Sequence, residues 1–341
     1  MESVKEEIKR IVTDRVLPRV SRVERGWEEV GRGADGTPTM RVDEVAEREF
    51  LKGLEERGLE ARVISEEAGE VIVGESPEVT LVLDPLDGSH NASKGLPFYC
   101  VSVGLADPEA DSLSDVEDGL VVSELMTFES TEPVEERPVV ERPVVAAYYY
   151  GTDRLPTGLQ REFKLRCLGS VALELAMTCQ GILDGFVDVR GSLRPTDVAG
   201  AFGLGRDSAA FLFFREGREL GPEDIPLRPD FRFELAAARD EGTAKRLYDG
   251  LREDVGIRHV QELFGKHPEG LTRHELCGKL GEECCELAHA VGKGEGYEEE
   301  LADVLALVMN LANELEVDVL DALKRKFRRV FECRGRRGRS G

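Results

Sequence analysis

One stretch of this chain, residues 84–91 with the sequence Asp-Pro-Leu-Asp-Gly-Ser-His-Asn, constrains its folding most strongly. It follows the apolar run 79–83, which predicts a buried strand that ends in a proline turn. Two carboxylates three residues apart, Asp84 and Asp87, suit a hard cation such as magnesium. The next glycine lets backbone approach a ligand closely, and a helix opening at Ser89 would point free amides at an anion. A cation beside a bound anion predicts chemistry on a phosphate ester.

The same residues also allow a plainer interpretation. Asp, Pro, Gly and Ser are ordinary turn residues, so an Asx turn without a ligand stays open. A calcium loop of the helix-loop-helix type does not fit, because its oxygen ligands alternate along a longer loop. Two further acidic segments favour the metal site. Residues 63–69 end an apolar run in the adjacent carboxylates Glu66 and Glu67, and Asp197 stands at the mouth of a small-residue helix within residues 193–201.

With these three segments the sequence resembles the inositol monophosphatase superfamily, and within it the archaeal-type enzymes that act on fructose 1,6-bisphosphate and inositol phosphates. The resemblance covers residues 4–251, and the segments occur in the family's order. It implies an α+β fold built of alternating helix and sheet layers, of the αβαβα type. It also implies a phosphomonoester hydrolase that uses two or three magnesium ions and a metal-activated water.

The resemblance assigns roles to matching positions of this chain. A water oriented by Glu66 or Glu67 with the Ser89 hydroxyl would attack phosphorus in line, and a second metal would stabilise the leaving oxygen. Backbone amides near Gly88 and Ser89 would hold the phosphate oxygens. Many members carry threonine where this chain has Ser89, but the hydroxyl is kept. The implied magnesium ligands are Glu66, Asp84, Asp87 and Asp197, together with the carbonyl of Leu86.

Residues 33–43, Gly-Ala-Asp-Gly-Thr-Pro-Thr-Met-Arg-Val-Asp, predict a loop before a helix because of their glycine and proline content. The stretch resembles the family's mobile catalytic loop. Asp43 matches the position that the family uses for a third, weaker metal. An equally good interpretation is that Asp43 is the N-cap of the following helix.

Arginines near two further segments are candidates for the alcohol side or the second phosphate of a substrate. Residues 163–174 predict a strand, a glycine turn and a helix, and residues 182–190 predict a strand that ends at an arginine. In the family the matching segment lines the substrate pocket, and arginine suits phosphate through its planar fork. An arginine at a strand end is also often a plain surface charge. The candidates are Arg166, Ser170, Arg190 and Arg194.

Length, charge and cysteines limit the remaining possibilities. A chain of 341 residues favours two domains, here 1–252 and 253–333, followed by a basic glycine-rich tail at 334–341 that we expect to be disordered. The formal charge of −23 disfavours nucleic acid and anionic membranes as partners, and it could also reflect a hot or high-salt environment. No apolar run is long enough for a membrane span, the start is too charged for a secretory signal, and seven cysteines without CxxC spacing argue against a disulfide framework. We therefore expect a cytoplasmic protein.

The other elements follow from hydrophobic periodicity and turn residues. We expect an amphipathic helix over residues 3–25, bent near Pro18, and a helix over 43–57. Further predictions are strands at 98–106, 119–128, 211–214 and 233–238, a polar loop at 131–142 and a polar helix at 239–251.

Beyond residue 252 the pattern becomes purely helical and carries a second set of carboxylates. Glu283 and Glu286 share one helix face, and Glu300 and Asp303 share another after a glycine-rich turn. Antiparallel packing would bring the four together, and convergent like charges need a cation between them. The alternative is that these acids are solvated faces beside an apolar core. That core would contain Leu280, Leu287, Val291, Leu301, Val304 and Leu305.

The order of these acidic pairs resembles the all-α nucleotide pyrophosphatases of the MazG and phosphoribosyl-ATP pyrophosphatase type, over residues 257–332. The resemblance implies that the four carboxylates bind magnesium and that a metal-activated water cleaves a nucleoside triphosphate to the monophosphate and pyrophosphate. It also implies at least a homodimer. The alternative function is a non-catalytic module that senses nucleotide or drives dimerisation. Candidates for contacting the phosphates are Lys324, Lys326, Arg328 and Arg329.

Overall fold

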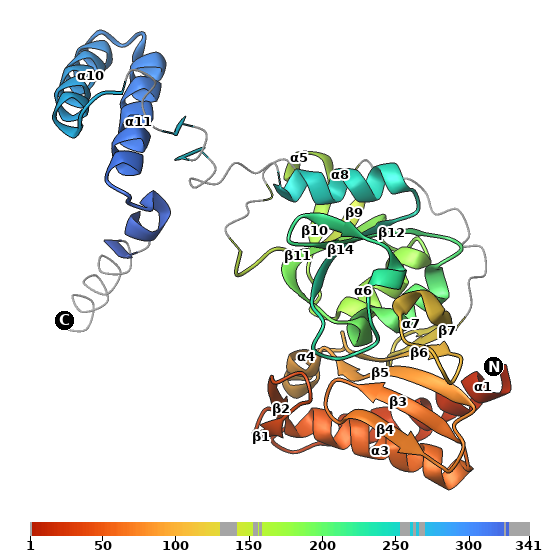
Figure 1. Ribbon diagram of the computed structural model, residues 1–341. Coiled ribbons are helices and arrows are strands. Elements are labelled where there is room, and N and C mark those ends of the chain that lie inside the picture. Colours follow the sequence, from red (N-terminus) through yellow and green to blue (C-terminus); the bar gives the residue numbers. More distant parts are fainter. Residues whose placement is uncertain are drawn as a thin grey trace. The chain divides into compact units, whose positions relative to one another are not determined.

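The structure is a computed structural model that divides into two compact units (Figure 1). The first unit holds the described residues up to 252, and the second holds those from 260 onward. The expected boundary near residue 253, the loop predicted at 131–142 up to residue 141, and the tail at 334–341 lie outside the described residues. None of the described helices combines the length and apolar character needed to cross a bilayer. The structure describes residues 2–129, 142–152, 156, 159–252, 260–261, 264–265, 270–323 and 325–326.

The helices and strands of the first unit have the following bounds. The helices are α1 (Glu2–Ile11), α2 (Leu17–Val20), α3 (Arg41–Arg57), α4 (Ser89–Lys94), α5 (Leu159–Glu162), α6 (Val171–Cys179), α7 (Pro195–Gly205) and α8 (Glu241–Arg252). The strands are β1 (Glu29–Arg32), β2 (Pro38–Met40), β3 (Ala61–Ser65), β4 (Gly69–Val73), β5 (Val79–Asp87), β6 (Cys100–Ala106), β7 (Val116–Val122), β8 (Thr127–Phe128), β9 (Val144–Tyr148), β10 (Lys164–Arg166), β11 (Gly185–Leu193), β12 (Ala210–Arg215), β13 (Arg218–Leu220) and β14 (Phe233–Ala238).

Two six-stranded sheets, a small two-stranded sheet of β1 and β2, and three layers of helices make up this unit (Figure 1). The first sheet has the order β4-β3-β5-β6-β7-β8, and the second has the order β10-β9-β11-β14-β12-β13. One apolar cluster joins α1 and α3 to the outer face of the first sheet, and another places α6 and α7 between the sheets. A third packs α8 on the outer face of the second sheet. The predicted αβαβα layering of an α+β fold is confirmed.

Strand β5 shows why the sequence folds this way. Leu81 and Leu83 pack toward α1 and α3, while Val82 between them packs into the cluster with α6 and α7. A strand buried on both faces needs apolar side chains at odd and even positions alike. The continuous apolar run that ends at Leu83 therefore predicts the central strand that the structure contains.

Several predicted bounds differ in the structure. The N-terminal helix ends at Val20 instead of residue 25, and a π-helical turn at Val12–Val16, rather than Pro18 alone, interrupts it. The strand expected at 119–128 is a hairpin, because Ser123 accepts and donates hydrogen bonds across the turn between β7 and β8. Strand β11 continues past Arg190 to Leu193.

Helix α7 lies unusually close to the first sheet, which fixes the position of Asp197 in its first turn. A Cβ atom added at Gly119 would lie 1.9 Å from the carbonyl oxygen of Gly200, and one added at Gly203 would lie 2.1 Å from that of Asp118. Small residues on both elements therefore allow the helix backbone to rest against the strands. The small-residue composition of residues 197–205 serves this packing.

Gly119→Ala is expected to destabilise the first unit by about 1–3 kcal/mol, because the added methyl group forces α7 away from the sheet. Denaturant unfolding of the full chain measures this change. Gly31→Ala is the matched control, since no atom lies within 4 Å of its added Cβ. Equal unfolding free energies for the two variants would contradict the close packing.

The second unit contains the helix pair α10 (Arg273–Lys293) and α11 (Tyr297–Glu314). The side chain of Thr272 caps α10 through the amide of Glu275, and Gly294 ends it with a φ of 82°. Leu276 on α10 and Leu307 and Met309 on α11 are buried. The core expected for this pair is only partly right, because Val291, Leu301 and Leu305 are 61%, 48% and 50% exposed.

Candidate active site

Three buried carboxylates from separate elements lie close together in the first unit. Glu66 directly follows β3, Asp84 lies in β5, and Asp197 lies in the first turn of α7. One oxygen of each lies within 4.8 Å of the others. The three side chains are at most 6% exposed. Three of the four carboxylates that the resemblance names as magnesium ligands thus lie together, and Asp87 is not in this group.

The motif at residues 84–88 does not leave the strand as a turn, contrary to expectation. Strand β5 continues to Asp87, and the pairing with β6 shifts register between Asp84 and Asp87. This irregularity changes the direction in which the Asp87 side chain points, while the strand continues. Gly88 then adopts a φ of 93° as the N-cap of α4, where a Cβ atom would lie 2.8 Å from the Phe98 carbonyl. Helix α4 begins at Ser89, as predicted.

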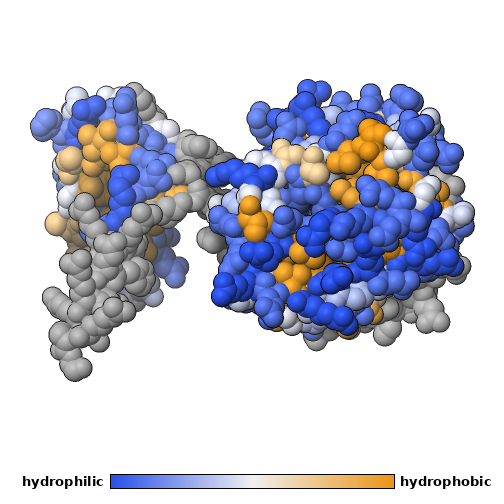
Figure 2. Space-filling view, turned by 90° about the horizontal axis from the view of Figure 1, so that it is seen from below, coloured by the Kyte–Doolittle hydropathy of each residue, from blue (hydrophilic) through white to orange (hydrophobic). Residues whose placement is uncertain are grey.

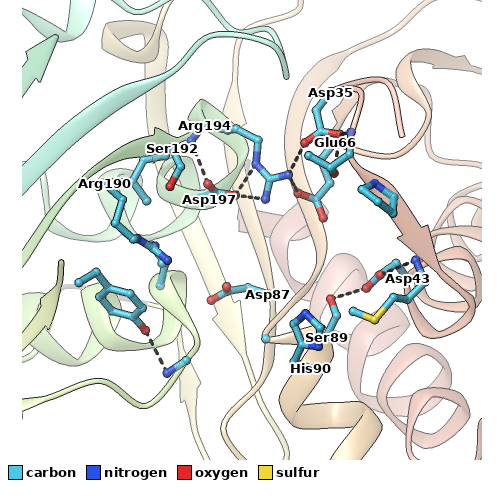
Figure 3. A pocket seen from close by; sticks show the side chains of 18 of the residues that line it. Asp35, Asp43, Glu66, Asp87, Ser89, His90, Arg190, Ser192, Arg194 and Asp197 are labelled. Carbon is cyan, nitrogen blue, oxygen red and sulfur yellow. Dashed lines mark hydrogen bonds and ion pairs between the residues drawn. The ribbon is translucent and has the colours of Figure 1, made fainter. Parts of the chain in front are cut away.

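A cavity of about 410 Å³ opens beside the carboxylates (Figure 3). Its wall combines acidic groups with three arginines, and the arginines supply positive charge that an anionic substrate needs. Arg190 reaches it from β11, Arg194 from the start of α7 and Arg232 from the loop before β14. Predicted site residues on this wall are Asp43, Glu66, Glu67, Asp87, Gly88, Ser89, Arg190, Arg194 and Asp197.

Asp87 is held by groups from the neighbouring helix layer. Its Oδ2 atom accepts hydrogen bonds from the Ser170 hydroxyl at 2.6 Å and from the Ala172 amide at 2.7 Å. Ser170 is fully buried and does not line the cavity, so its expected contact with substrate is wrong. Ser170 supports Asp87 instead.

The Ser89 hydroxyl lies between two oxygens that carry predicted roles. It contacts the carboxylate of Asp43 and lies 2.9 Å from the carbonyl oxygen of Leu86. Asp43 is the third residue of α3 and accepts a hydrogen bond from the Met40 amide at 3.1 Å. Met40 is therefore the N-cap, and the interpretation of Asp43 as the N-cap is wrong. Asp43 nevertheless caps this helix from its first turn.

Glu67 and two candidate arginines take separate places. Glu67 accepts a hydrogen bond from the Thr39 hydroxyl. Arg190 forms an ion pair with the buried Asp188 and lies over the ring of Tyr148 at 4.5 Å. Arg166 is exposed and does not line the cavity, so the structure does not bring it to the site.

Burial and mutual repulsion raise the pKa values of the acidic groups. Burial, followed by the charge of neighbouring carboxylates, holds the pKa of Asp84 well above its usual range. Burial likewise raises the pKa of Asp43 to about 6, that of Asp87 to about 6 and that of Glu67 to about 7. A bound cation would remove this repulsion.

This repulsion gives the metal-free protein a pH dependence. A carboxyl whose pKa is raised by folding contributes stability that is present below its unfolded pKa and is lost as pH rises through its folded pKa. Because the pKa of Glu67 rises from 4.5 to about 7, we expect the unfolding temperature of the metal-free protein to fall between pH 5 and 8. The unfolding temperature of metal-free Glu67→Gln should fall less over the same pH range. Thermal scans with chelator measure both slopes, and equal slopes would contradict the assignment.

The donor set fits magnesium. Among the described residues, Glu66 Oε2 is a buried oxygen that accepts no hydrogen bond, although Arg194 contacts it as an ion pair. Magnesium prefers oxygen ligands and is held by a few carboxylates plus substrate phosphate. Three carboxylates with oxygens within 4.8 Å of one another, one of which also has an oxygen without a hydrogen bond, offer such ligands.

Sequence reasoning missed several residues of this wall. Asp35 accepts ion pairs from Arg194 at 2.8 Å and from Arg232 at 3.1 Å. The same carboxylate accepts hydrogen bonds from the amide and hydroxyl of Thr37, both at 2.8 Å. The Asp-Gly-Thr order at residues 35–37 indicated a turn with a side-chain acceptor, but it could not indicate the arginine partners.

The second unit contains a smaller acidic group. Glu283 on α10 and Glu300 and Asp303 on α11 have oxygens within 4.8 Å of one another. Glu286 lies outside this group but lines a neighbouring pocket with His289 and Glu300. The predicted convergence therefore holds for three of the four carboxylates. Of the candidate cations, Lys326 is exposed, and Lys324, Arg328 and Arg329 lie outside the described residues.

A layered α+β unit with buried carboxylates beside an arginine-lined cavity defines a class, the hydrolases of phosphate esters. Comparisons identify the family within that class. The inositol monophosphatase family profile matches residues 1–206, more than half of the chain, and the MazG nucleotide pyrophosphohydrolase domain matches residues 271–332. The chain belongs to the inositol monophosphatase family, with a MazG domain fused to its C-terminal side. Magnesium binding is typical of this family.

Individual relatives agree with this assignment. A fructose-1,6-bisphosphatase/inositol-1-monophosphatase of Methanothermobacter thermautotrophicus is 31% identical over 221 residues, which cover 57% of this chain and 79% of the relative. An enzyme of the same description from Thermococcus kodakarensis is 30% identical over 255 residues, which cover 71% and 93%. A solved Pyrococcus horikoshii protein, described as similar to inositol-1 monophosphatase, shares 26% identity with a TM-score of 0.56 and covers 72% of this chain and 96% of its own.

Proposed function

We propose that the first unit is a magnesium-dependent phosphomonoester hydrolase that acts on inositol 1-phosphate, fructose 1,6-bisphosphate or both. This proposal rests on one observation: the carboxylates of Glu66, Asp84 and Asp197 cluster at the side of an arginine-lined cavity. Relatives described as acting on both substrates support the same substrate class. A cavity of about 410 Å³ suits a small sugar or polyol phosphate.

Each side chain has a role in this proposal. Glu66, Asp84, Asp87 and Asp197, with the Leu86 carbonyl, hold magnesium, and Asp43 is the candidate for a further ion. Magnesium supplies Lewis-acid stabilisation of the phosphoryl oxygens and lowers the pKa of a bound water. Glu67, whose pKa is raised to about 7, is positioned to take a proton from the attacking water near neutral pH. The Gly88 and Ser89 amides face the phosphate, and Arg190 binds the remainder of the substrate.

For the second unit we propose hydrolysis of nucleoside triphosphates to monophosphate and pyrophosphate. The convergence of Glu283, Glu300 and Asp303 supports a magnesium site there. The exposed side chains of Val291, Leu301 and Leu305 support a homodimer, because apolar surface of this kind is commonly covered by a partner. Figure 2 shows apolar surface on the helical unit. The competing function is a nucleotide-sensing or dimerisation module without catalysis.

Removal and return of magnesium tests the first activity. Chelator-treated protein should release no phosphate from inositol 1-phosphate or fructose 1,6-bisphosphate, and added magnesium should restore release. Phosphate release at full rate in chelator, or none from either ester in saturating magnesium, would overturn the proposal.

A further inference from the structure

The guanidinium of Arg194, on the wall of the cavity, lies among the carboxylates of Asp35, Glu66 and Asp197 (Figure 3). Its Nη2 and Nε atoms lie 2.7 and 2.9 Å from Oδ1 of Asp197. Its Nη1 atom lies 2.8 Å from Oδ2 of Asp35 and also forms an ion pair with Glu66. One cation thus contacts two of the three carboxylates that would bind metal.

Charge explains why a cation lies there. Like charges so close together cannot all be ionised unless an opposite charge lies among them. The Arg194 side chain is only 19% exposed, and a guanidinium does not lose its proton in a protein. Its single positive charge therefore offsets part of the negative charge of Glu66 and Asp197 without any bound ion.

The same contacts put Arg194 in competition with a divalent ion. Oε2 of Glu66 and Oδ1 of Asp197 contact the guanidinium, and both carboxylates belong to the three that converge as candidate metal ligands. Oε2 of Glu66 lies against the guanidinium without accepting a hydrogen bond, so this contact is a close pairing of charge alone. A metal ligated by that oxygen would meet the positive charge of Arg194 directly.

The contact with Asp35 connects this competition to the loop at residues 33–37. Backbone amides of Ala34 and Asp35 donate to the carbonyls of Glu67 and Glu66 at 2.9 and 3.3 Å. The Asp35 side chain is 1% exposed and is held by Arg194 and Arg232. Movement of Arg194 would leave Arg232 as the remaining arginine partner of Asp35.

We propose that Arg194 is a built-in counter-ion of the metal site, which keeps the carboxylates together before magnesium binds and lowers magnesium affinity by competing for Glu66 and Asp197. Magnesium binding displaces the guanidinium from these oxygens and thereby loosens its tie to the loop at residues 33–37. This inference rests on the metal site of the proposed function.

Calorimetric titration of chelator-treated full-length chain with magnesium alone tests the inference. Every protein carries Asp303→Asn, so that magnesium binding by the second unit is reduced equally. Arg194→Gln should bind magnesium about tenfold more tightly or better, because an opposite charge in contact changes a carboxylate's affinity for a cation by at least that factor. Arg232→Gln is the matched control, because it removes a cavity arginine that contacts Asp35 but neither Glu66 nor Asp197. Its affinity should stay much closer to that of the unsubstituted chain.

A second readout is thermal unfolding without metal. The unfolding temperature of Arg194→Gln should fall in chelator and should rise more on magnesium addition than that of the unsubstituted chain. Equal or weaker magnesium binding by Arg194→Gln overturns the inference while the metal site stands. No magnesium binding by the first unit of the unsubstituted chain overturns the proposed function itself.

Two further measurements apply if Arg194→Gln does not fold. Arg194→Met removes the charge but keeps an unbranched side chain of similar length, and it should bind magnesium more tightly than the unsubstituted chain. In the unsubstituted chain the Nε–H resonance of Arg194 should shift as magnesium is added. An unchanged resonance at saturating magnesium would overturn the inference.

Discussion

Asp84→Asn is expected to lower magnesium-dependent phosphate release by about two to three orders of magnitude, because a lost ligand removes several kcal/mol of charge stabilisation. The variant should still fold. Asn keeps an oxygen for the amide of Leu86, which lies 3.0 Å from Oδ1 of Asp84. It also removes a charge that repels Glu66 and Asp197, so the metal-free unfolding temperature should stay level or rise. Phosphate release and a thermal scan of the same preparation measure both changes.

Glu70→Gln is the matched control for this substitution. Glu70 lies on β4 of the same sheet and is exposed, with its carboxylate paired to Arg62. We expect its phosphate release to match the unsubstituted chain. Full phosphate release by Asp84→Asn would show that Asp84 is not a metal ligand. A large loss of phosphate release in Glu70→Gln would show that the effect is not specific to the cavity.

Asp303→Asn is expected to abolish release of pyrophosphate from nucleoside triphosphates, with a loss of about two to three orders of magnitude if the second unit is catalytic. The reason is that Asp303 contributes one of the three oxygens that converge with Glu283 and Glu300. Separate assay of pyrophosphate, rather than total phosphate, keeps the first unit from contributing.

Glu299→Gln gives the comparison on the same helix. Glu299 is an exposed acid in the first turn of α11 and lies outside the converging group. Its pyrophosphate release should be unchanged. If the unsubstituted chain releases no pyrophosphate but nucleotide alters its phosphatase rate, the sensing module is the correct function for this unit.

Most of the layered fold and the identity of the acidic residues could be predicted from the sequence. Apolar runs such as the one before Asp84 predict buried strands, because both faces of β5 are covered. Short motifs predict that Glu66 and Asp197 are site residues, and each motif lies at the end of one strand or the start of one helix. Local pattern sufficed there, because each motif holds its own backbone geometry.

Contacts between distant parts of the chain could not be predicted from local pattern. Arg194 and Asp35 are 159 positions apart, and only the folded structure shows that the arginine pairs with carboxylates as well as lining the cavity. Ser170 shows the same limit, since its sequence context suggested substrate and its hydroxyl supports Asp87. A register shift in β5, which turns the expected loop into strand, depends on pairing with β6.

The most direct test of the account assigns each product to its own site. The unsubstituted chain, Asp84→Asn and Asp303→Asn are each given magnesium with inositol 1-phosphate, fructose 1,6-bisphosphate or a nucleoside triphosphate, and phosphate and pyrophosphate are measured separately. The account predicts that Asp84→Asn loses phosphate release from the esters and keeps pyrophosphate release, while Asp303→Asn does the reverse. Phosphate release that survives in Asp84→Asn, or that disappears in Asp303→Asn, would contradict it.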